Sequence, residues 1–281
     1  MEAVDFVRAA LDEDIGPGDL TTMAVVPLEL AGKAHIRAKD HLVVCGQELA
    51  ELAFVEVARR YGGGVAFEAV VPDGEWATHG DVVSRIEAPY RVILIAERLA
   101  LNLLMKLSGI ATNVRGFVEA AGSDGPRVVD TRKTTPLLRD LEKYAVRCGG
   151  ARNHRHGLYD GVMVKDNHIR AVESLTLAVE RARQEAHHLV RVEVEVKTLA
   201  ELNEALSTAA DVILLDNMNR DQLAECVDLA RRKRPEILLE ASGNMTPERI
   251  AALADLDLDF VSAGGLIHQA RWIDLSLKFD D

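Results

Sequence analysis

The chain has few cysteines and no long apolar run. Its 281 residues include three cysteines, Cys45, Cys148 and Cys226, which are far apart and form no CxxC pair. This argues against a disulfide framework or a cysteine-based metal knuckle and indicates a reducing compartment. No apolar run approaches the ~18 residues that a membrane-spanning helix needs. Met1 leads directly into charged sequence without a basic signal region, so we expect a cytoplasmic protein with no membrane partner.

Positive charge is scarce in the chain as a whole but dense in one segment. The 33 Lys and Arg residues against 45 Asp and Glu residues give a net charge of -12. Residues 131–170 nevertheless carry nine Lys or Arg against four Asp or Glu. A cationic pocket in an acidic chain fits a small, multiply charged anion. A nucleic-acid surface would be broader, so we expect no nucleic-acid partner.

The second part of the chain alternates β-branched runs with amphipathic segments such as 221–233 and 247–256. Strand and helix at this rhythm predict right-handed βαβ units and a parallel sheet. Six strands of this kind indicate an incomplete α/β barrel. The six expected strands cover residues 127–130, 161–165, 190–196, 211–216, 236–240 and 259–263.

The first hundred residues have a different rhythm. Strand-like pieces at 33–38 and 81–86 are mixed with helical patterns at 47–61 and 96–107. This mixture predicts an open-faced α+β sandwich domain. We place the boundary where the apolar helix is expected to stop, which gives an N-terminal domain over residues 1–108. The barrel would cover residues 109–281, with its last helix packing back on the N-terminal domain.

Polar residues follow every expected strand of the barrel. The carboxyl ends of parallel barrel strands converge on one face, where active sites form. Charged groups after nearly all strands therefore predict a catalytic mouth, although polar residues also begin ordinary loops. The clusters are Asp130 to Lys133, Lys165 to His168, Glu195, Asp216 with Asn217, Glu240 to Asn244, and Ser262 to Gly265.

Four cationic or imidazole side chains of this face could bind a dicarboxylate. Guanidinium groups grip carboxylates with two parallel hydrogen bonds, and ammonium acts as a compact charge. We expect Arg132, His154, Arg155 and Lys165 to share this task.

Acidic residues point to a second function of the same mouth. Glu193 and Glu195 alternate with valines, so both carboxylates face one side of their strand, as they would on an exposed edge strand. On a central barrel strand they would point inward. There Glu195 with Asp216 suits a hydroxyl-rich sugar and an oxygen-loving cation such as Mg2+.

Glycine-containing turns follow the last two strands, at 242–244 and 263–265. Loops after late barrel strands often hold phosphate through backbone N–H groups, and glycine permits the close approach. The sequence thus predicts one site for a dicarboxylate, one for ribose and a metal ion, and one for phosphate. Together these sites indicate glycosyl transfer.

These motifs match a known family nearly from end to end. The chain resembles the quinolinate phosphoribosyltransferases, also called carboxylating nicotinate-nucleotide pyrophosphorylases, through EDIGPGDLT, DTRKTTP, GGARNHR, VKDNHI, VEVEV, LLDNM, EASGN and SAGGLIH. The resemblance implies a type II phosphoribosyltransferase fold, at least a homodimer, and no organic cofactor. It also implies transfer of phosphoribose from phosphoribosyl pyrophosphate to quinolinate, with loss of pyrophosphate and CO2, giving nicotinate mononucleotide for NAD biosynthesis.

The same resemblance assigns residues to roles. The catalytic set would be Lys133, Lys165, Glu195 and Asp216, with Glu195 and Asp216 holding Mg2+ directly or through water. Quinolinate would contact Arg132, His154, Arg155, Lys165 and the neighbouring subunit's Arg98, and Lys133 would meet pyrophosphate. The remaining substrate-binding residues would be Thr131, Ser242, Gly243, Asn244, Ala263, Gly264, Gly265 and His268. His156 departs from the apolar residue expected in the family and receives no role.

Other functions stay open at this point. A relative of the same fold with a different acceptor is the nearest alternative, although the Arg and His set favours quinolinate. His154 and His156 form an HxH pattern that could serve a metal hydrolase, but the preceding CGGARN reads as loop rather than strand. Lys165 could form a Schiff base, yet Asp166 and His168 do not promise the apolar niche that such a lysine needs. A non-enzymatic sugar-phosphate sensor is a further class.

Overall fold

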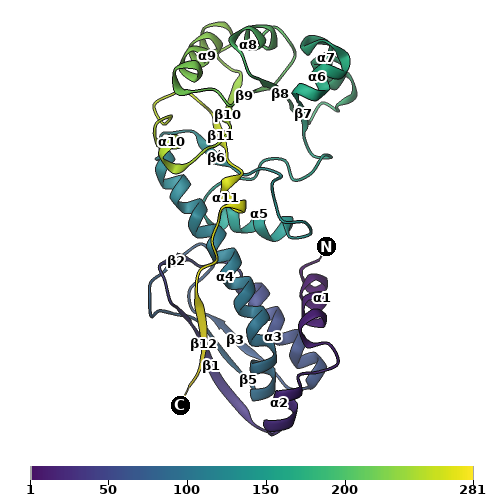
Figure 1. The fold of residues 1–281 in the computed structure, drawn as a ribbon, viewed down its shortest axis with the longest axis vertical. Coiled ribbons are helices and arrows are strands. Elements are labelled where there is room, and N and C mark those ends of the chain that lie inside the picture. The colour runs from purple at the N-terminus through teal and green to yellow at the C-terminus, as the bar shows by residue number, and fades with distance from the viewer. Residues whose placement is uncertain (1, 281) are drawn as a thin grey trace. The chain divides into compact units, whose positions relative to one another are not determined.

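The computed structural model describes residues 2–280, which form two compact units (Figure 1). One unit contains the described residues up to Arg115, Asp140–Gly150 and the segment from Ala270. The other contains Gly116–Arg139 and Ala151–Gln269. No helix of the described residues is long and apolar enough to cross a membrane.

The first unit is built on an antiparallel sheet with strand order β12-β1-β5-β3. Buried Ala34 and Ile36 of β1 pair with Ile86 and Ser84 of β5, which are also buried. Helix α1 packs against α3. The elements are α1 (Ala3–Ile15), α2 (Leu20–Val25), β1 (Ala31–Ala38), β2 (Leu42–Val43), α3 (Gln47–Tyr61), β3 (Ala66–Ala69), β4 (Trp76–Ala77), β5 (Val82–Pro89), α4 (Tyr90–Ala121, whose end lies in the second unit), α5 (Arg139–Cys148) and β12 (Leu275–Phe279).

The end of the chain returns to this sheet as a strand. We expected a last helix there, which is wrong, because Leu275–Phe279 form β12 and pair antiparallel with β1. Leu275 and Leu277 are buried and Lys278 is exposed, which is the two-residue period of a strand with one covered face.

Helix α4 is longer than its apolar pattern predicted. It continues through Gly109 to Ala121, so the expected stop at residue 108 is wrong. Glycine here costs helix stability of ~1 kcal/mol relative to alanine. A Cβ at Gly109 would lie 2.1 Å from the carbonyl oxygen of Arg271, so only glycine lets that backbone pass. The domain boundary at residue 108 stays a prediction, and it falls inside α4.

The second unit carries a six-stranded sheet with the order β6-β11-β10-β9-β8-β7, in which all pairs are parallel. All six predicted strands are present, and the predicted α/β class is confirmed. β6 and β7 are the two edges, so the sheet is not closed by hydrogen bonds among the described residues, as expected of an incomplete barrel. The elements are β6 (Arg127–Val129), β7 (Val162–Val164), α6 (Asp166–Val172), α7 (Leu175–Glu185), β8 (Val192–Val196), α8 (Leu199–Ala205), β9 (Val212–Asp216), α9 (Arg220–Lys233), β10 (Leu238–Ser242), α10 (Pro247–Ala251), β11 (Phe260–Ser262) and α11 (Gly265–His268).

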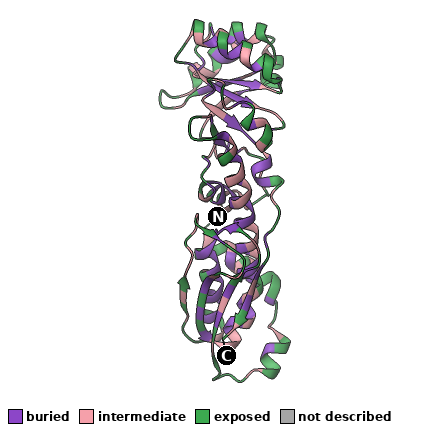
Figure 2. Cartoon of the chain, turned by 90° about the vertical axis from the view of Figure 1, so that its left-hand side faces the viewer, coloured by how far each residue is buried: buried purple, intermediate pink, exposed green. Residues whose placement is uncertain are grey.

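Helix caps fix where the loops of this unit end. Ser174, Thr198, Asn219 and Thr246 each accept a hydrogen bond from a backbone N–H in the first turn of the following helix. The loops from β8 to α8 and from β9 to α9 are therefore short. Figure 2 shows the strands mostly buried, with exposed residues on the covering helices. The polar residues at the strand ends are thus held by rigid elements on both sides.

Candidate active site

A cavity of about 720 Å³ lies in the second unit and is lined by residues from the carboxyl ends of the strands. It brings together fifteen of the sixteen predicted site residues. Arg98 does not line it and lies exposed on α4. The lining includes Thr131, Arg132, Lys133, His154, Arg155, Lys165, Glu195, Asp216, Ser242, Gly243, Asn244, Ala263, Gly264, Gly265 and His268.

Two guanidinium groups crowd one side of this cavity. Burial and the nearby charge of Arg132 lower the pKa of Arg155 below its usual value. Arg155 donates a hydrogen bond to the carbonyl oxygen of Gly161 at 3.0 Å. This acceptor is neutral, so it does not balance the positive charge of the guanidinium group. Like charges held this close favour an anion with more than one negative group.

A buried aspartate positions the loop that carries His154 and Arg155. Asp130 is fully buried at the end of β6 and accepts hydrogen bonds from the Asn153 amide at 2.7 Å and the His154 N–H at 2.8 Å. Arg152 extends the sheet beside β6 through a parallel bridge to Val129. The loop is therefore fixed from the same strand end that supplies Arg132.

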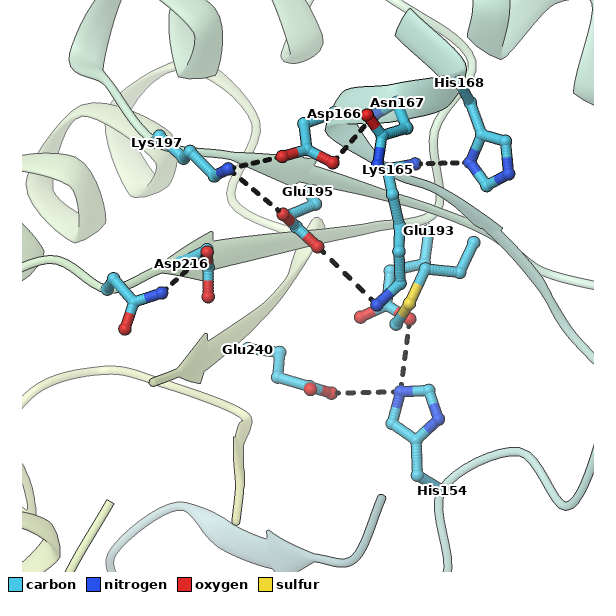
Figure 3. Close-up of polar contacts among 12 residues, drawn as sticks. His154, Lys165, Asp166, Asn167, His168, Glu193, Glu195, Lys197, Asp216 and Glu240 are labelled. Carbon is cyan, nitrogen blue, oxygen red and sulfur yellow. Dashed lines mark hydrogen bonds and ion pairs between the residues drawn. The ribbon is translucent and has the colours of Figure 1, made fainter. Parts of the chain in front are cut away.

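Acidic and basic side chains lie close together at the ends of β7, β8 and β9 (Figure 3). We call Lys165, Asp166, Glu195, Lys197 and Asp216 the outer cluster. Lys165 Nζ and Lys197 Nζ each lie 3.8 Å from an oxygen of Glu195, and Lys197 Nζ lies 2.7 Å from Asp166. Burial and the charge of Asp216 raise the pKa of Glu195, while the charge of Lys165 offsets part of this.

The Glu195 and Asp216 pair fits a hard divalent cation. Both carboxylates line the cavity, and burial together with their mutual repulsion raises the pKa of Glu195. A bound cation would relieve that repulsion, and carboxylate oxygens are the donors that Mg2+ prefers.

A second acidic group is buried near the cavity, and it was not predicted from the sequence. His154 Nε2 lies 3.2 Å from Glu193 Oε2 and 3.6 Å from Glu240 Oε2 (Figure 3). We call these three residues the inner triad. Both glutamates are buried, with exposures of 6% and 3%. Each also has a buried Oε1 without a hydrogen-bond partner.

Glycine is required in the loops after the late strands. Gly243 has a φ of +104°, and a Cβ there would lie 2.2 Å from Asn217 Oδ1. A Cβ at Gly264 would lie 2.8 Å from Lys133 Cδ and 3.0 Å from His268 Nε2. Two residues predicted to meet pyrophosphate or phosphate, Lys133 and His268, are therefore neighbours of Gly264.

Several lining or positioning residues were missed by sequence reasoning. Glu240 was noted only as part of a strand end, because LLEAS in β10 lacks the strict alternation that marked the acids of β8. The positioning role of Asp130 and Asn153 had no local signal, because their contact spans 23 residues. Met163 lines the cavity without any motif.

The HxH alternative finds no support in the geometry. Among the described residues, the groups close enough to share a metal ion are His154 with Glu193 and Glu240, and Cys45 with Asp73 and Cys148. Neither includes His156.

Comparisons with known proteins agree over nearly the whole chain. Models of the quinolinate phosphoribosyl transferase N-terminal and C-terminal domains match residues 19–108 and 110–278. A probable carboxylating nicotinate-nucleotide pyrophosphorylase of Synechocystis sp. is 43% identical, covering 95% of this chain and 89% of that protein. The corresponding probable enzyme of Bacillus subtilis is 40% identical over 94% of this chain and 89% of its own length.

Solved structures extend the similarity to the fold. The crystal structure of NadC from Streptococcus pyogenes superposes with a TM-score of 0.92 at 40% identity, covering 99% of this chain and 96% of that one. A nicotinate-nucleotide pyrophosphorylase from Francisella tularensis gives a TM-score of 0.92 at 34% identity, covering 99% and 96%. With its cavity, its strand-end residues and both domain models in agreement, the chain belongs to the quinolinate phosphoribosyltransferase family.

Proposed function

We propose that this chain transfers phosphoribose from phosphoribosyl pyrophosphate to quinolinate, releasing pyrophosphate and CO2 and forming nicotinate mononucleotide for NAD biosynthesis. One observation carries the proposal. A cationic group, a carboxylate pair and two glycine loops, drawn from separate strand ends, line a single cavity. Two anionic substrates can therefore lie side by side in it, which lowers the entropic cost of bringing them together.

The cationic side suits quinolinate. Its two carboxylates would face Arg132, His154, Arg155 and Lys165. Burial and the nearby charge of Arg132 lower the pKa of Arg155 before any anion arrives. A dianion relieves that repulsion, whereas an acceptor with a single carboxylate would relieve less of it. This favours quinolinate over the different acceptor of a related pyrophosphorylase.

The other half suits phosphoribosyl pyrophosphate. Glu195 and Asp216 would hold the ribose hydroxyls together with Mg2+, and Lys133 would meet the pyrophosphate. Ser242, Gly243, Asn244, Ala263, Gly264, Gly265 and His268 would surround the 5′-phosphate, with Thr131 beside them. When bound, Mg2+ would neutralise charge on the leaving pyrophosphate. No organic cofactor is needed for the chemistry that follows.

The reaction then proceeds by positioning and electrostatics. The bond between ribose C1 and the pyrophosphate oxygen breaks, and its electron pair leaves with pyrophosphate. Glu195 and Asp216 stabilise the positive charge that develops on the sugar, while the pyridine nitrogen forms the new bond to C1. The alkylated nitrogen is now cationic. It stabilises the electron pair left on the neighbouring ring carbon when CO2 departs, and a proton completes the product.

We also propose a homodimer in which Arg98 reaches the quinolinate of the neighbouring subunit. Its support is that Arg98 is exposed on α4. Mixing Arg98→Ala with Asp216→Asn protein would test this, because a mixed dimer regains one complete site. Recovery of about a quarter of wild-type activity is expected, and no recovery would contradict the shared site.

The three cysteines are free, which supports a cytoplasmic location.

Product analysis tests the function itself. The protein is incubated with quinolinate labelled in the carboxylate next to the ring nitrogen, with phosphoribosyl pyrophosphate and Mg2+. Labelled CO2, nicotinate mononucleotide and pyrophosphate should appear in equal amounts. Turnover of another acceptor with no labelled CO2 would favour a related pyrophosphorylase.

A further inference from the structure

The inner triad has a geometry that the binding of a dicarboxylate does not require. Its two glutamates come from β8 and β10, and both carboxylates converge on one imidazole nitrogen of His154 (Figure 3). The other oxygen of each carboxylate, Glu193 Oε1 and Glu240 Oε1, is buried without a hydrogen-bond partner. Burying a negatively charged oxygen without a hydrogen-bond partner costs free energy, so this arrangement needs a physical explanation.

The tautomer of His154 argues against a metal ion at this place. The backbone N–H of Arg155 donates to His154 Nδ1 at 2.7 Å. Nδ1 therefore carries the lone pair and Nε2 carries the proton that faces the glutamates. A metal bound at Nε2 would need the opposite arrangement, with Nδ1 donating to an acceptor.

The geometry instead favours an extra proton in the triad. His154 Nε2 lies 3.2 Å from Glu193 and 3.6 Å from Glu240, and burial makes it costly for both carboxylates to be ionised side by side. The charge of His154 and the contact with Ser262 favour the ionised form of Glu240 and act against this. Burial, followed by the charge of Glu193, raises the pKa of Glu240 to about 7. Burial lowers the pKa of His154, but its contacts with the two glutamates outweigh burial, which also favours a proton in this cluster.

Of the two glutamates, Glu240 lines the large cavity beside His154 and Lys165, and Glu193 does not. The proposed function requires a proton for the ring carbon that loses CO2. We propose that Glu240 is the general acid that protonates this carbon. This inference rests on the proposed function and names a catalytic residue for its last step.

The step balances in atoms and charge. The bond between the ring carbon and CO2 breaks, and its electron pair stays on that carbon. This pair then takes the proton of Glu240, the O–H bond breaks, and Glu240 becomes a carboxylate. His154 Nε2–H can hydrogen-bond to the new anion, and water returns the proton after the product leaves.

The groups facing Glu240 decide its pH dependence. They are Glu193 on β8, Ser262 on β11, Lys165 after β7 and His154 on the loop fixed by Asp130. Only protonated Glu240 can donate. We therefore expect kcat of the wild type to fall as the pH rises above about 7.

Three variants test the proposal. Glu240→Gln keeps the size of the side chain but cannot supply a proton, so kcat should fall about 100-fold with little change in the KM for quinolinate. Its kcat should also lose the fall above about pH 7. Glu240→Asp keeps an acid at a greater distance and should retain more activity than the Gln variant. Glu236→Gln, an exposed glutamate two residues before β10, should behave like the wild type.

A second readout separates a chemical role from a structural one. Reaction in mixed H2O and D2O incorporates H or D at the vacated carbon of nicotinate mononucleotide, in a ratio that depends on the proton donor. The ratio should change in Glu240→Gln, where water must donate directly, and stay constant in Glu236→Gln.

The possible results are distinguishable. An active wild type whose Glu240→Gln variant keeps both kcat and the isotope ratio would overturn the inference alone. Zinc retained at one ion per chain through dialysis, and lost in Glu240→Gln, would replace it with a metal site. A wild type that releases no CO2 from quinolinate would refute the proposed function and this inference with it.

Discussion

The inner triad and the outer cluster each take one glutamate from the same strand, yet these two glutamates differ in burial and in the charges around them. β8 supplies Glu193 to the triad and Glu195 to the outer cluster, two residues apart. Glu195 is partly exposed and has Lys165 and Lys197 at 3.8 Å. Glu193 is buried against the imidazole of His154, with the charges of Arg155 and Glu240 nearby. Glu195 therefore lies where a ligand or ion can reach it, whereas burial of Glu240 in the inner triad favours its protonated form.

The largest expected effect is at the outer cluster. Asp216→Asn removes a charge that we propose stabilises the ribose cation, so kcat/KM for phosphoribosyl pyrophosphate should fall by about 10²- to 10³-fold. Steady-state kinetics at varied Mg2+ would measure it. Asp228→Asn, an exposed aspartate on α9, is the matched control. A loss below about fivefold would show that the outer cluster is not the ribose site.

The next effect lies on the side of the inner triad. Arg132→Ala removes a charge-assisted hydrogen bond to the dicarboxylate and should weaken quinolinate binding by ~2 kcal/mol, or about 30-fold in Kd. Calorimetric titration measures this directly, with exposed Arg170→Ala as control. Unchanged affinity in Arg132→Ala would reject its role.

A smaller effect concerns the loop after β10, where Gly243 lies against Asn217, the neighbour of Asp216. Gly243→Ala would place a methyl group 2.2 Å from Asn217 Oδ1 at a φ of +104°, so the protein should lose about 1–3 kcal/mol of unfolding free energy. Gly116→Ala, in α4 with nothing within 4 Å, should instead gain ~0.5–1 kcal/mol. Urea denaturation compares the two. Equal changes would mean that Gly243 is not needed for the loop.

The smallest effect concerns the stability of the inner triad. The pKa of Glu240 is raised from 4.5 to about 7, so its stabilising contribution is present below pH 4.5 and lost as the pH rises through 7. Glu240→Gln removes this loss. Its Tm should exceed that of the wild type by a few degrees at pH 8, with a smaller difference at pH 5. A Tm below the wild type at pH 8 would mean that ionised Glu240 has a compensating partner.

The same contrast explains what the sequence could predict. Strand ends such as Asp216 and Lys165 are marked by a local change from β-branched to polar residues, and parallel topology brings them together. The triad has no such mark, because His154 meets Glu240 across 86 positions of the chain, and the meeting depends on a loop fixed by Asp130. The strand β12 was mistaken for a helix because five residues are too few for periodicity to decide.

The central claim is that one cavity binds two anions through separate groups. Calorimetry with quinolinate alone, and with phosphoribosyl pyrophosphate plus Mg2+, on the wild type, Arg132→Ala and Asp216→Asn tests it most directly. The account predicts a crossed pattern, in which Arg132→Ala loses quinolinate binding and keeps phosphoribosyl pyrophosphate, while Asp216→Asn does the reverse. Parallel loss of both ligands in both variants would contradict it.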